Sequence, residues 1–268
     1  MDRYASAEPA SGDEFKPFVN TARVALIGLP LSRPAVGEVV VWRLRLSADA
    51  SQIRAWREAL PRIEQERAAR FHHLADAERF ILGRIAVRRI LGQRLGVPPA
   101  QVELTADPAG KLHLNHPGPR WEFNLSHSGR YILVGVAWAR AVGVDVELRR
   151  PDFPAEIASR FFAPEEIADL HAVPPSEQQA VFYALWTRKE ATLKARGLGL
   201  GFPLADFAVS SLSGQPPRLL RWADEVSPEL TWRLWSLDLD ADHAGALVVR
   251  HDPMEPTVRL TSFDGLPT

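Results

Sequence analysis

The pattern of hydrophobic and polar positions predicts a first half that mixes helices with strands. A β-branched run that turns into strict alternation predicts a strand over 38–46. Apolar residues three and four positions apart predict a helix over 77–95, ended by Gly96 and the prolines after it. Four arginines are expected to project from this helix: Arg79, Arg84, Arg88 and Arg89. Shorter strands are predicted at 102–104, 111–114 and 131–138.

A similar pattern begins again after about residue 140. A strand is predicted over 143–148, and Pro164 with two glutamates opens a helix. Ser176 and Gln179 form a predicted capping box before a second long helix that runs to about Arg196. The Arg-Phe pairs at 70–71 and 160–161 precede the two long helices, which fits a duplicated unit. Chance similarity between two amphipathic helices is the alternative.

These patterns predict an α+β fold of two similar halves, each a small antiparallel sheet packed with a long helix. We expect a flexible tail over 1–35, a first half over 36–140 and a second half over 141–268.

Composition narrows the class of protein. The chain has 268 residues, 46% of them hydrophobic, and a formal net charge of −1, so no global charge attracts it to nucleic acid or to an anionic membrane. It contains no cysteine, which excludes disulfides and thiolate catalysis and fits a reducing compartment such as the cytoplasm. The first 20 residues lack an apolar signal, and no 18-residue apolar run occurs, so neither secretion nor a membrane span is expected.

Lysine is rare in this chain and is concentrated near one glutamate. The chain has four lysines among 32 basic residues, and Lys189 and Lys194 lie on either side of Glu190. An ammonium group can give up a proton and a guanidinium essentially cannot, so this cluster indicates a phosphate-binding or proton-transfer role. A coincidence of composition is the alternative.

Two further acids stand at alternate positions of a predicted strand. Asp145 and Glu147 should point to one face, while Val144 and Val146 point to the other face and into a core. Paired carboxylates on a fixed strand suit Mg²⁺, whereas the alternative is an ordinary polar outer face.

Trp186, Glu190 and Lys194 are expected to share one side of the second long helix. Alone, Glu190 and Lys194 would be an ordinary surface ion pair, with Trp186 in the core. Combined with the strand acids, Glu190 could complete a Mg²⁺ site whose other ligands are water and a substrate phosphate. Lys194 would then meet a phosphate oxygen.

The segment Phe123-Asn-Leu-Ser-His-Ser-Gly129 crowds hydrogen-bonding groups into a strand and turn. Ser126 lies outside a nucleophile elbow and next to His127, so serine hydrolase geometry is unfavourable. Anion binding by the hydroxyls, the imidazole and turn N–H groups is the functional interpretation, and a hydrophilic loop is the alternative.

Taken in order, these three segments resemble the phosphopantetheinyl transferases, specifically the larger, Sfp-type members that activate peptide and polyketide synthetases. The motifs are the 123–129 segment, Gly143-Val-Asp-Val-Glu147 and Trp186-x-x-Lys-Glu-Ala-x-x-Lys194. The resemblance implies a monomer of two α+β halves with coenzyme A in the cleft between them.

The resemblance also implies roles for individual residues. Asp145, Glu147 and Glu190 would hold Mg²⁺, or Mn²⁺ in its place, against the coenzyme A diphosphate. Ser126 and His127 would bind the 3′-phosphate of the adenosine. The remaining coenzyme-binding residues implied are Lys111, Lys189, Lys194, Arg67, Arg70 and Arg79. Two positions depart from the family pattern, because Leu112 replaces a proline and Glu64 replaces a basic residue.

The implied reaction moves phosphopantetheine from coenzyme A to a serine of an apo acyl or peptidyl carrier protein, releasing adenosine 3′,5′-bisphosphate. Glu190 or Glu166 would accept the serine proton, and Lys194 would stabilise the leaving group. Two alternatives are a non-catalytic coenzyme A-binding or carrier-docking protein and a Mg²⁺-dependent phosphodiesterase.

Overall fold

The computed structural model describes residues 38–46, 49–108, 110–117, 120–152, 155–199, 201–211, 216–222, 228–251 and 256–262. The tail predicted over 1–35 lies outside these residues.

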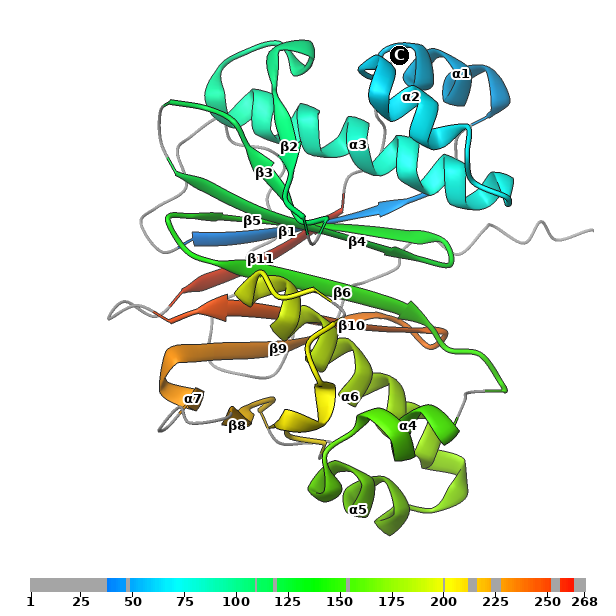
Figure 1. Ribbon diagram of the computed structural model, residues 1–268, viewed down its shortest axis with the longest axis vertical. Coiled ribbons are helices and arrows are strands. Elements are labelled where there is room, and N and C mark those ends of the chain that lie inside the picture. Colours follow the sequence, from blue (N-terminus) through cyan, green and yellow to red (C-terminus); the bar gives the residue numbers. More distant parts are fainter. Residues whose placement is uncertain are drawn as a thin grey trace, which may run out of the picture.

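Two sheets stack face to face in the middle of the molecule, and helices cover the outer side of each (Figure 1). The first sheet has the strand order β11-β1-β5-β4, and the second has the order β6-β10-β9. Their bounds are β1 (Glu38–Arg45), β4 (Trp121–Ser128), β5 (Tyr131–Trp138), β11 (Thr257–Ser262), β6 (Val142–Leu148), β9 (Trp232–Asp240) and β10 (His243–Arg250).

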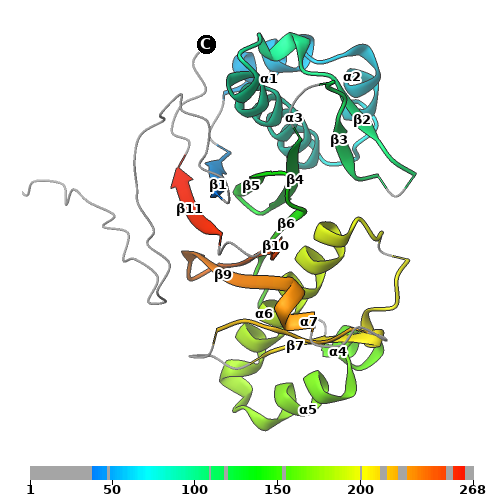
Figure 2. The ribbon, with the colours of Figure 1, turned by 90° about the vertical axis from the view of Figure 1, so that its left-hand side faces the viewer.

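Helices of the first half lie on one outer side, and those of the second half lie on the other (Figure 2). The first group is α1 (Ala50–Glu58), α2 (Arg62–Ala68) and α3 (Leu74–Leu95), and the second is α4 (Ala155–Phe161), α5 (Pro164–Ala172) and α6 (Pro175–Arg196). Smaller elements complete the chain: β2 (Leu104–Ala106), β3 (Leu112–Leu114), β7 (Phe207–Val209), β8 (Leu219–Trp222), α7 (Pro228–Thr231) and two 3₁₀ turns at Pro99–Gln101 and Leu204–Asp206.

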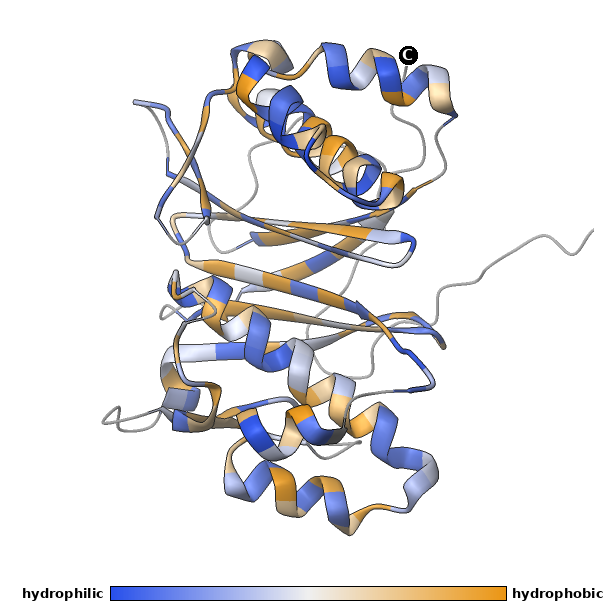
Figure 3. Cartoon of the chain, turned by 45° about the vertical axis from the view of Figure 1, so that its right-hand side comes forward, coloured by the Kyte–Doolittle hydropathy of each residue, from blue (hydrophilic) through white to orange (hydrophobic). Residues whose placement is uncertain are grey.

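Three hydrophobic cores follow from this layering. One lies between α1–α3 and the first sheet, one lies between the two sheets, and one lies between α6 and the second sheet. Hydrophobic residues, orange in Figure 3, run along the central strands, while the helical ends of the molecule carry many hydrophilic residues. Burial on both faces explains why the central strands are so rich in valine and leucine.

The two halves resemble each other as predicted. Each has a long helix of 22 residues, α3 or α6, packed on a mainly antiparallel sheet. Each helix ends at a glycine in the left-handed region, Gly96 with φ 70° and Gly197 with φ 73°. The α+β fold is therefore confirmed, while the division of the chain near residue 140 stays a prediction.

The end of the chain returns to the first sheet. Strand β11 pairs in parallel with β1, with Glu38 opposite Thr257, and Arg259 forms an ion pair with Glu38. Sequence patterns assigned no element there. Residues 257–262 therefore belong in space with the first sheet, although they come from the second half of the sequence.

The predicted capping box before α6 is wrong. The helix begins at Pro175, and Pro174 precedes it without any side-chain cap. Gln179 lies inside the helix, and its side-chain amide donates to the carbonyl of Arg150 at 2.7 Å. Proline at the first helical position needs no cap for its own nitrogen, so the pair at 174–175 starts the helix by itself.

Within the described part of the chain, no helix is both long and apolar enough to cross a bilayer.

Candidate functional site

Strands β4 and β6 lie side by side and join the two sheets through side chains. The amide oxygen of Asn124 accepts the N–H of Val144 at 2.9 Å. The hydroxyls of Ser126 and Ser128 accept the next two N–H groups on that side of β6, at 3.4 Å and 3.1 Å. The polar residues of the 123–129 segment therefore lie on β4. Their side chains form a seam with β6, in which hydrogen bonds from side chain to backbone replace the usual backbone ladder between two strands.

The strand acids point as predicted. Val144 and Val146 are completely buried in the core between the sheets. Asp145 points to the other face and is only 2% exposed, so the alternative of an ordinary solvated outer face is wrong for this residue. A carboxylate this deeply buried needs a compensating partner.

Gly143 brings helix α6 very close to this face of β6. A Cβ atom at this glycine would lie 2.5 Å from the backbone nitrogen of Ala195, and closer still to the carbonyl oxygen of Ala191. The helix backbone therefore rests directly on β6, and Glu190 and Lys194 face the strand acids.

Lys194 is the partner of Asp145. Its amine lies 2.6 Å from Asp145 Oδ1 and 3.0 Å from the hydroxyl oxygen of Ser126. The same hydroxyl donates to Asp145 Oδ1 at 2.8 Å. Glu147 accepts from Ser128 at 2.9 Å, so both acids are tied to the seam.

Burial and neighbouring acidic charge disfavour ionisation of Glu190 and Glu147. Burial first, and then the charge of Asp145, raises the pKa of Glu190 to about 7. The same two causes raise the pKa of Glu147 to about 6. Within the residues that the structure describes, no group of three or more acidic or histidine side chains is already arranged to hold a metal ion. The acids are thus close enough to interact electrostatically without forming a finished ligand set.

Two buried oxygens in this group lack a hydrogen-bond partner. They are Oδ2 of Asp145 and Oε1 of Glu190. Unpaired carboxylate oxygens beside mutually repelling acids fit a hard divalent cation, which would supply the missing positive charge.

A pocket of about 220 Å³ opens beside these acids and is lined by both halves of the chain. Its polar wall includes Arg84, Lys111, Asn124, Glu190 and Lys194. Lys111 reaches across the pocket from the first half and donates to the carbonyl of Lys194 at 2.8 Å. Burial lowers the pKa of the Lys111 ammonium group.

Of the residues predicted to contact the adenosine part of coenzyme A, some lie near Lys194 and the turn after β4, whereas others are exposed on the surface. Arg79 forms an ion pair with Asp76 and donates to the carbonyl of Gly129 at 3.0 Å, at the turn after β4. The pKa of His127 is lowered, first by desolvation and then by the charges of Arg79 and Lys194. His127 therefore lies close to both Arg79 and Lys194.

Arg67 and Arg70 are exposed on the surface and are not among the described residues that line the pocket. The guanidinium of Arg67 lies 5.4 Å from the ring centre of Phe80.

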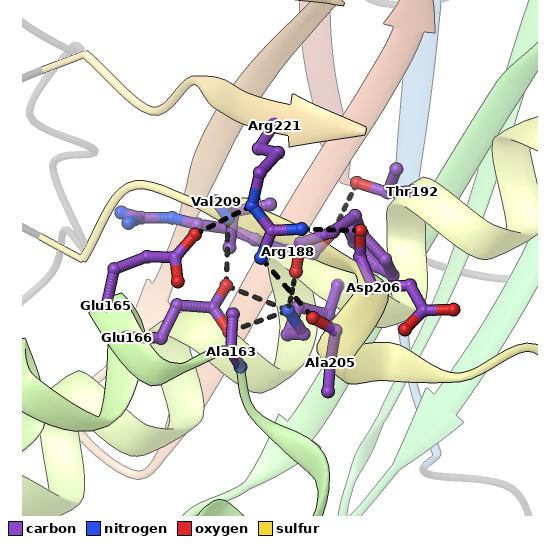
Figure 4. A network of polar contacts seen from close by, with 11 residues as sticks. Ala163, Glu165, Glu166, Arg188, Thr192, Ala205, Asp206, Val209 and Arg221 are labelled. Atoms are coloured by element: carbon purple, nitrogen blue, oxygen red, sulfur yellow. Dashed lines mark hydrogen bonds and ion pairs between the residues drawn. The ribbon is translucent and has the colours of Figure 1, made fainter. Parts of the chain in front are cut away.

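Glu166 and Lys189 lie away from the pocket, in the interior of the second half. The Lys189 amine contacts both carboxylate oxygens of Glu166, at 2.9 Å and 2.6 Å, and the side chains are 0% and 1% exposed. Glu166 also accepts the backbone N–H groups of Ala163 and Val209 (Figure 4). Every acceptor position faces a protein donor, so this geometry does not support a base role for Glu166 or a coenzyme contact for Lys189.

The sequence pattern missed the burial of Arg84 and Arg88. Both were expected to project from the helix, yet they are only 6% and 4% exposed. Their side chains meet Glu64 on α2. The signal for this burial in the sequence was Glu64, an acid at a position where the family pattern has a basic residue.

Comparisons with known proteins find family models that match both parts of the chain. A model of the 4′-phosphopantetheinyl transferase superfamily matches residues 141–248, and a model of the N-terminal part of 4′-phosphopantetheinyl transferases matches residues 47–138. A solved holo-[acyl-carrier-protein] synthase from Thermotoga maritima aligns with 24% identity and a TM-score of 0.34, over 43% of this chain and 63% of that one.

Two relatives align over most of their length. The 4′-phosphopantetheinyl transferase HetI of Nostoc sp. is 35% identical, over 79% of this chain and 87% of the relative. The 4′-phosphopantetheinyl transferase Sfp of Bacillus subtilis is also 35% identical, over 76% of this chain and 88% of the relative. With both family models matching consecutive halves, the chain belongs to the 4′-phosphopantetheinyl transferase superfamily and is a larger, Sfp-type member.

Proposed function

We propose that this transferase moves the phosphopantetheine group of coenzyme A to a serine of an apo acyl or peptidyl carrier protein. The observation that carries the proposal is the meeting of Asp145, Glu147, Glu190 and Lys194 beside a pocket that both halves line. Because one chain supplies both sides of this site, we expect the enzyme to act as a monomer.

The cations of the site suit the phosphates of coenzyme A. Lys194 and Lys111 stand on the pocket wall and offer ammonium groups to the diphosphate. Ser126, His127 and Arg79 lie next to Lys194 or the turn after β4, where they can contact the adenosine end. Release of Lys194 from Asp145 would free its amine for a phosphate oxygen.

Glu190 is the proposed base for the serine hydroxyl. Its Oε1 has no hydrogen-bond partner, so this oxygen is available to accept the proton of the serine hydroxyl. Lys194 would stabilise or protonate the bisphosphate that leaves. The phosphorus–oxygen bond to the serine forms as the bond to the bisphosphate breaks.

Asp145, Glu147 and Glu190 would hold Mg²⁺, or Mn²⁺. The bound ion would offset negative charge on the diphosphate and on the leaving oxygen.

A test of this function mixes the protein with coenzyme A, Mg²⁺ and an apo carrier protein and records the carrier by mass spectrometry. We expect the carrier to gain one phosphopantetheine group. Binding of coenzyme A without modification would instead indicate a docking protein, and breakdown of coenzyme A without a carrier would indicate a phosphodiesterase.

Asp145→Ala should abolish transfer, because Lys194 loses its counterion and the acid group loses its central member. Asp238→Ala, which removes an exposed acid from β9, is the matched control. Circular dichroism of Asp145→Ala should match the unmodified protein, and near-normal transfer by this variant would contradict the assignment.

A further inference from the structure

Two turns from different sheets meet, and His243 lies between them. The first is the β4–β5 turn (129–130), and the second is the β9–β10 turn (241–242). The guanidinium of Arg130 lies 2.5 Å from a carboxylate oxygen of Asp240, the last residue of β9. This ion pair ties the turn of the first sheet to the turn of the second.

The His243 side chain is buried between the two turns. It is 3% exposed, and its ring lies edge-on to that of Tyr131, with ring centres 4.7 Å apart. Its Nδ1 lies 2.8 Å from Oδ1 of Asp240. Although burial opposes it, hydrogen bonds from Arg130, from the imidazole and from the Tyr131 hydroxyl hold the pKa of Asp240 well below its usual range. An ionised carboxylate can only accept a hydrogen bond, so Nδ1 of His243 carries the proton.

Asp240 thereby orients the imidazole toward the β4–β5 turn. The other ring nitrogen of His243, Nε2, has no hydrogen-bond partner and faces Gly129. A Cβ atom at Gly129 would lie only 2.5 Å from Nε2, and the φ of 54° at this position also favours glycine. The ring therefore occupies the space that a side chain at position 129 would need, and the backbone of the turn packs directly on it.

The β4–β5 turn follows a residue on which the candidate site depends. The hydroxyl of Ser128 accepts the N–H of Leu148 at 3.1 Å and donates to Oε2 of Glu147 at 2.9 Å. Strand β10 pairs with β6 so that His243 stands opposite Leu148. His243 is thus fixed to β6 through its backbone and contacts the turn after β4 through its ring, next to the hydroxyl that orients a proposed metal ligand.

We propose that His243 is a positioning residue for the metal site, which holds the β4–β5 turn so that Ser128 keeps Glu147 oriented toward a divalent cation. The proposal rests on the metal site of the function proposed above. Asp240 orients the ring, the ring holds the turn, and the hydroxyl before the turn orients the carboxylate. Hydrogen-bonded partners of metal ligands usually contribute about 10- to 100-fold to metal affinity.

The test measures binding of Mn²⁺ to the protein alone by electron paramagnetic resonance, in which the sharp signal of the free ion is lost on binding. We expect His243→Ala to weaken Mn²⁺ affinity by about 10-fold, and Ser128→Ala to weaken it by about 10- to 100-fold. In the double variant the loss should be close to that of Ser128→Ala alone, because His243 acts through this hydroxyl. Additive losses, or unchanged affinity in His243→Ala, would overturn the proposal, as would an absence of Mn²⁺ binding to the unmodified protein.

His171→Ala is the matched control, since His171 is exposed on α5, and its Mn²⁺ affinity should equal that of the unmodified protein. Thermal unfolding shows at which temperature His243→Ala is folded. If this variant does not fold, Asp240→Ala replaces it, because it removes the partner of the ring and leaves the ring in place. We expect Asp240→Ala to weaken Mn²⁺ affinity by at least about threefold, and unchanged affinity would overturn the proposal.

Transfer assays give a second readout. The Mg²⁺ concentration for half-maximal transfer should rise about 10-fold in His243→Ala, whereas a merely structural role would reduce the rate without moving this concentration. If no carrier is modified but the Mn²⁺ pattern holds, the transferase function fails and His243 keeps its role. If carriers are modified and the Mn²⁺ pattern is absent, the role of His243 fails alone.

Discussion

The surroundings of the Glu190 carboxyl make it hard to ionise. Its side chain is buried beside Asp145 and Glu147, and its pKa rises from 4.5 to about 7. A raised folded-state pKa means that ionised Glu190 destabilises the fold. This cost is absent below about pH 4.5 and complete above about pH 7, so stability falls as pH rises through that window.

Glu190→Gln should therefore stabilise the protein at pH 8, by about 3 kcal/mol, and should do little at pH 5. Chemical unfolding in the presence of a chelator measures both values. Mg²⁺ should stabilise the unmodified protein more at pH 8 than at pH 5, because the acids must be ionised to bind it. A Glu190→Gln variant that is less stable at pH 8 would contradict the repulsion between these acids.

Glu166 and Lys189 form an ion pair whose role is structural in this geometry. Lys189→Met should destabilise the protein by about 3 to 5 kcal/mol, because Glu166 would remain buried without its counterion. Burial already raises the pKa of Glu166 despite the nearby ammonium group. The double variant Lys189→Met with Glu166→Gln should recover part of the stability, measured by chemical unfolding.

Activity separates the structural role from a catalytic one. Turnover per folded molecule of Lys189→Met, measured at low temperature, should fall far less than turnover of Asp145→Ala. A complete loss of turnover in a fully folded Lys189→Met variant would instead support the roles predicted from the sequence, with Glu166 as a base and Lys189 in coenzyme binding.

At this scale the sequence predicted which acids meet, because alternation along β6 and spacing along α6 fix which side chains share a face. It did not separate Lys189 from Lys194. Both flank Glu190, but they lie five positions apart on the helix and so point in different directions. One enters the interior and the other enters the pocket.

Among the elements, the contact between α6 and β6 sets the distance between the acids. Gly143 makes this contact, and the atoms that a side chain there would meet belong to the helix backbone. Backbone atoms cannot rotate away as a flexible side chain can. The helix must shift if any side chain is added.

Gly143→Ala should therefore push α6 away from β6, which would separate Glu190 and Lys194 from Asp145. We expect a loss of at least about 1 to 3 kcal/mol of stability, the usual cost of overpacking, together with a large loss of transfer. Gly201→Ala is a matched control, since its Cβ would meet nothing within 4 Å. Unfolding and transfer assays on both variants decide the matter, and normal transfer by Gly143→Ala would refute this account.

Most elements were predictable from periodicity, and their boundaries were less so. The strand expected over 38–46 is Glu38–Arg45, and the helix expected over 77–95 begins at Leu74. The start of α6 was misassigned because a Ser-x-x-Gln pattern also occurs inside helices. Local patterns show which residues can form a helix, whereas Pro174 and Pro175 fix where α6 starts.

For the whole molecule, two sheets are joined by the seam of Asn124, Ser126 and Ser128 and by the core between them. The pairing of β11 with β1 was not predictable, because it connects positions more than 200 residues apart. Short-range patterns carry no information about which distant strand lies beside which. The pocket between the halves depends on the same long-range packing.

The return of β11 to β1 has a consequence for biosynthesis. A ribosome makes β1 long before β11, so one hydrogen-bonding edge of β1 stays open while the residues between them are synthesised. The backbone of β11 then pairs with that edge, and Val258 and Leu260 enter the core between the sheets. Closure of the first sheet therefore has to follow synthesis of β11, and until then the edge of β1 is where we expect a chaperone to protect the unfinished protein.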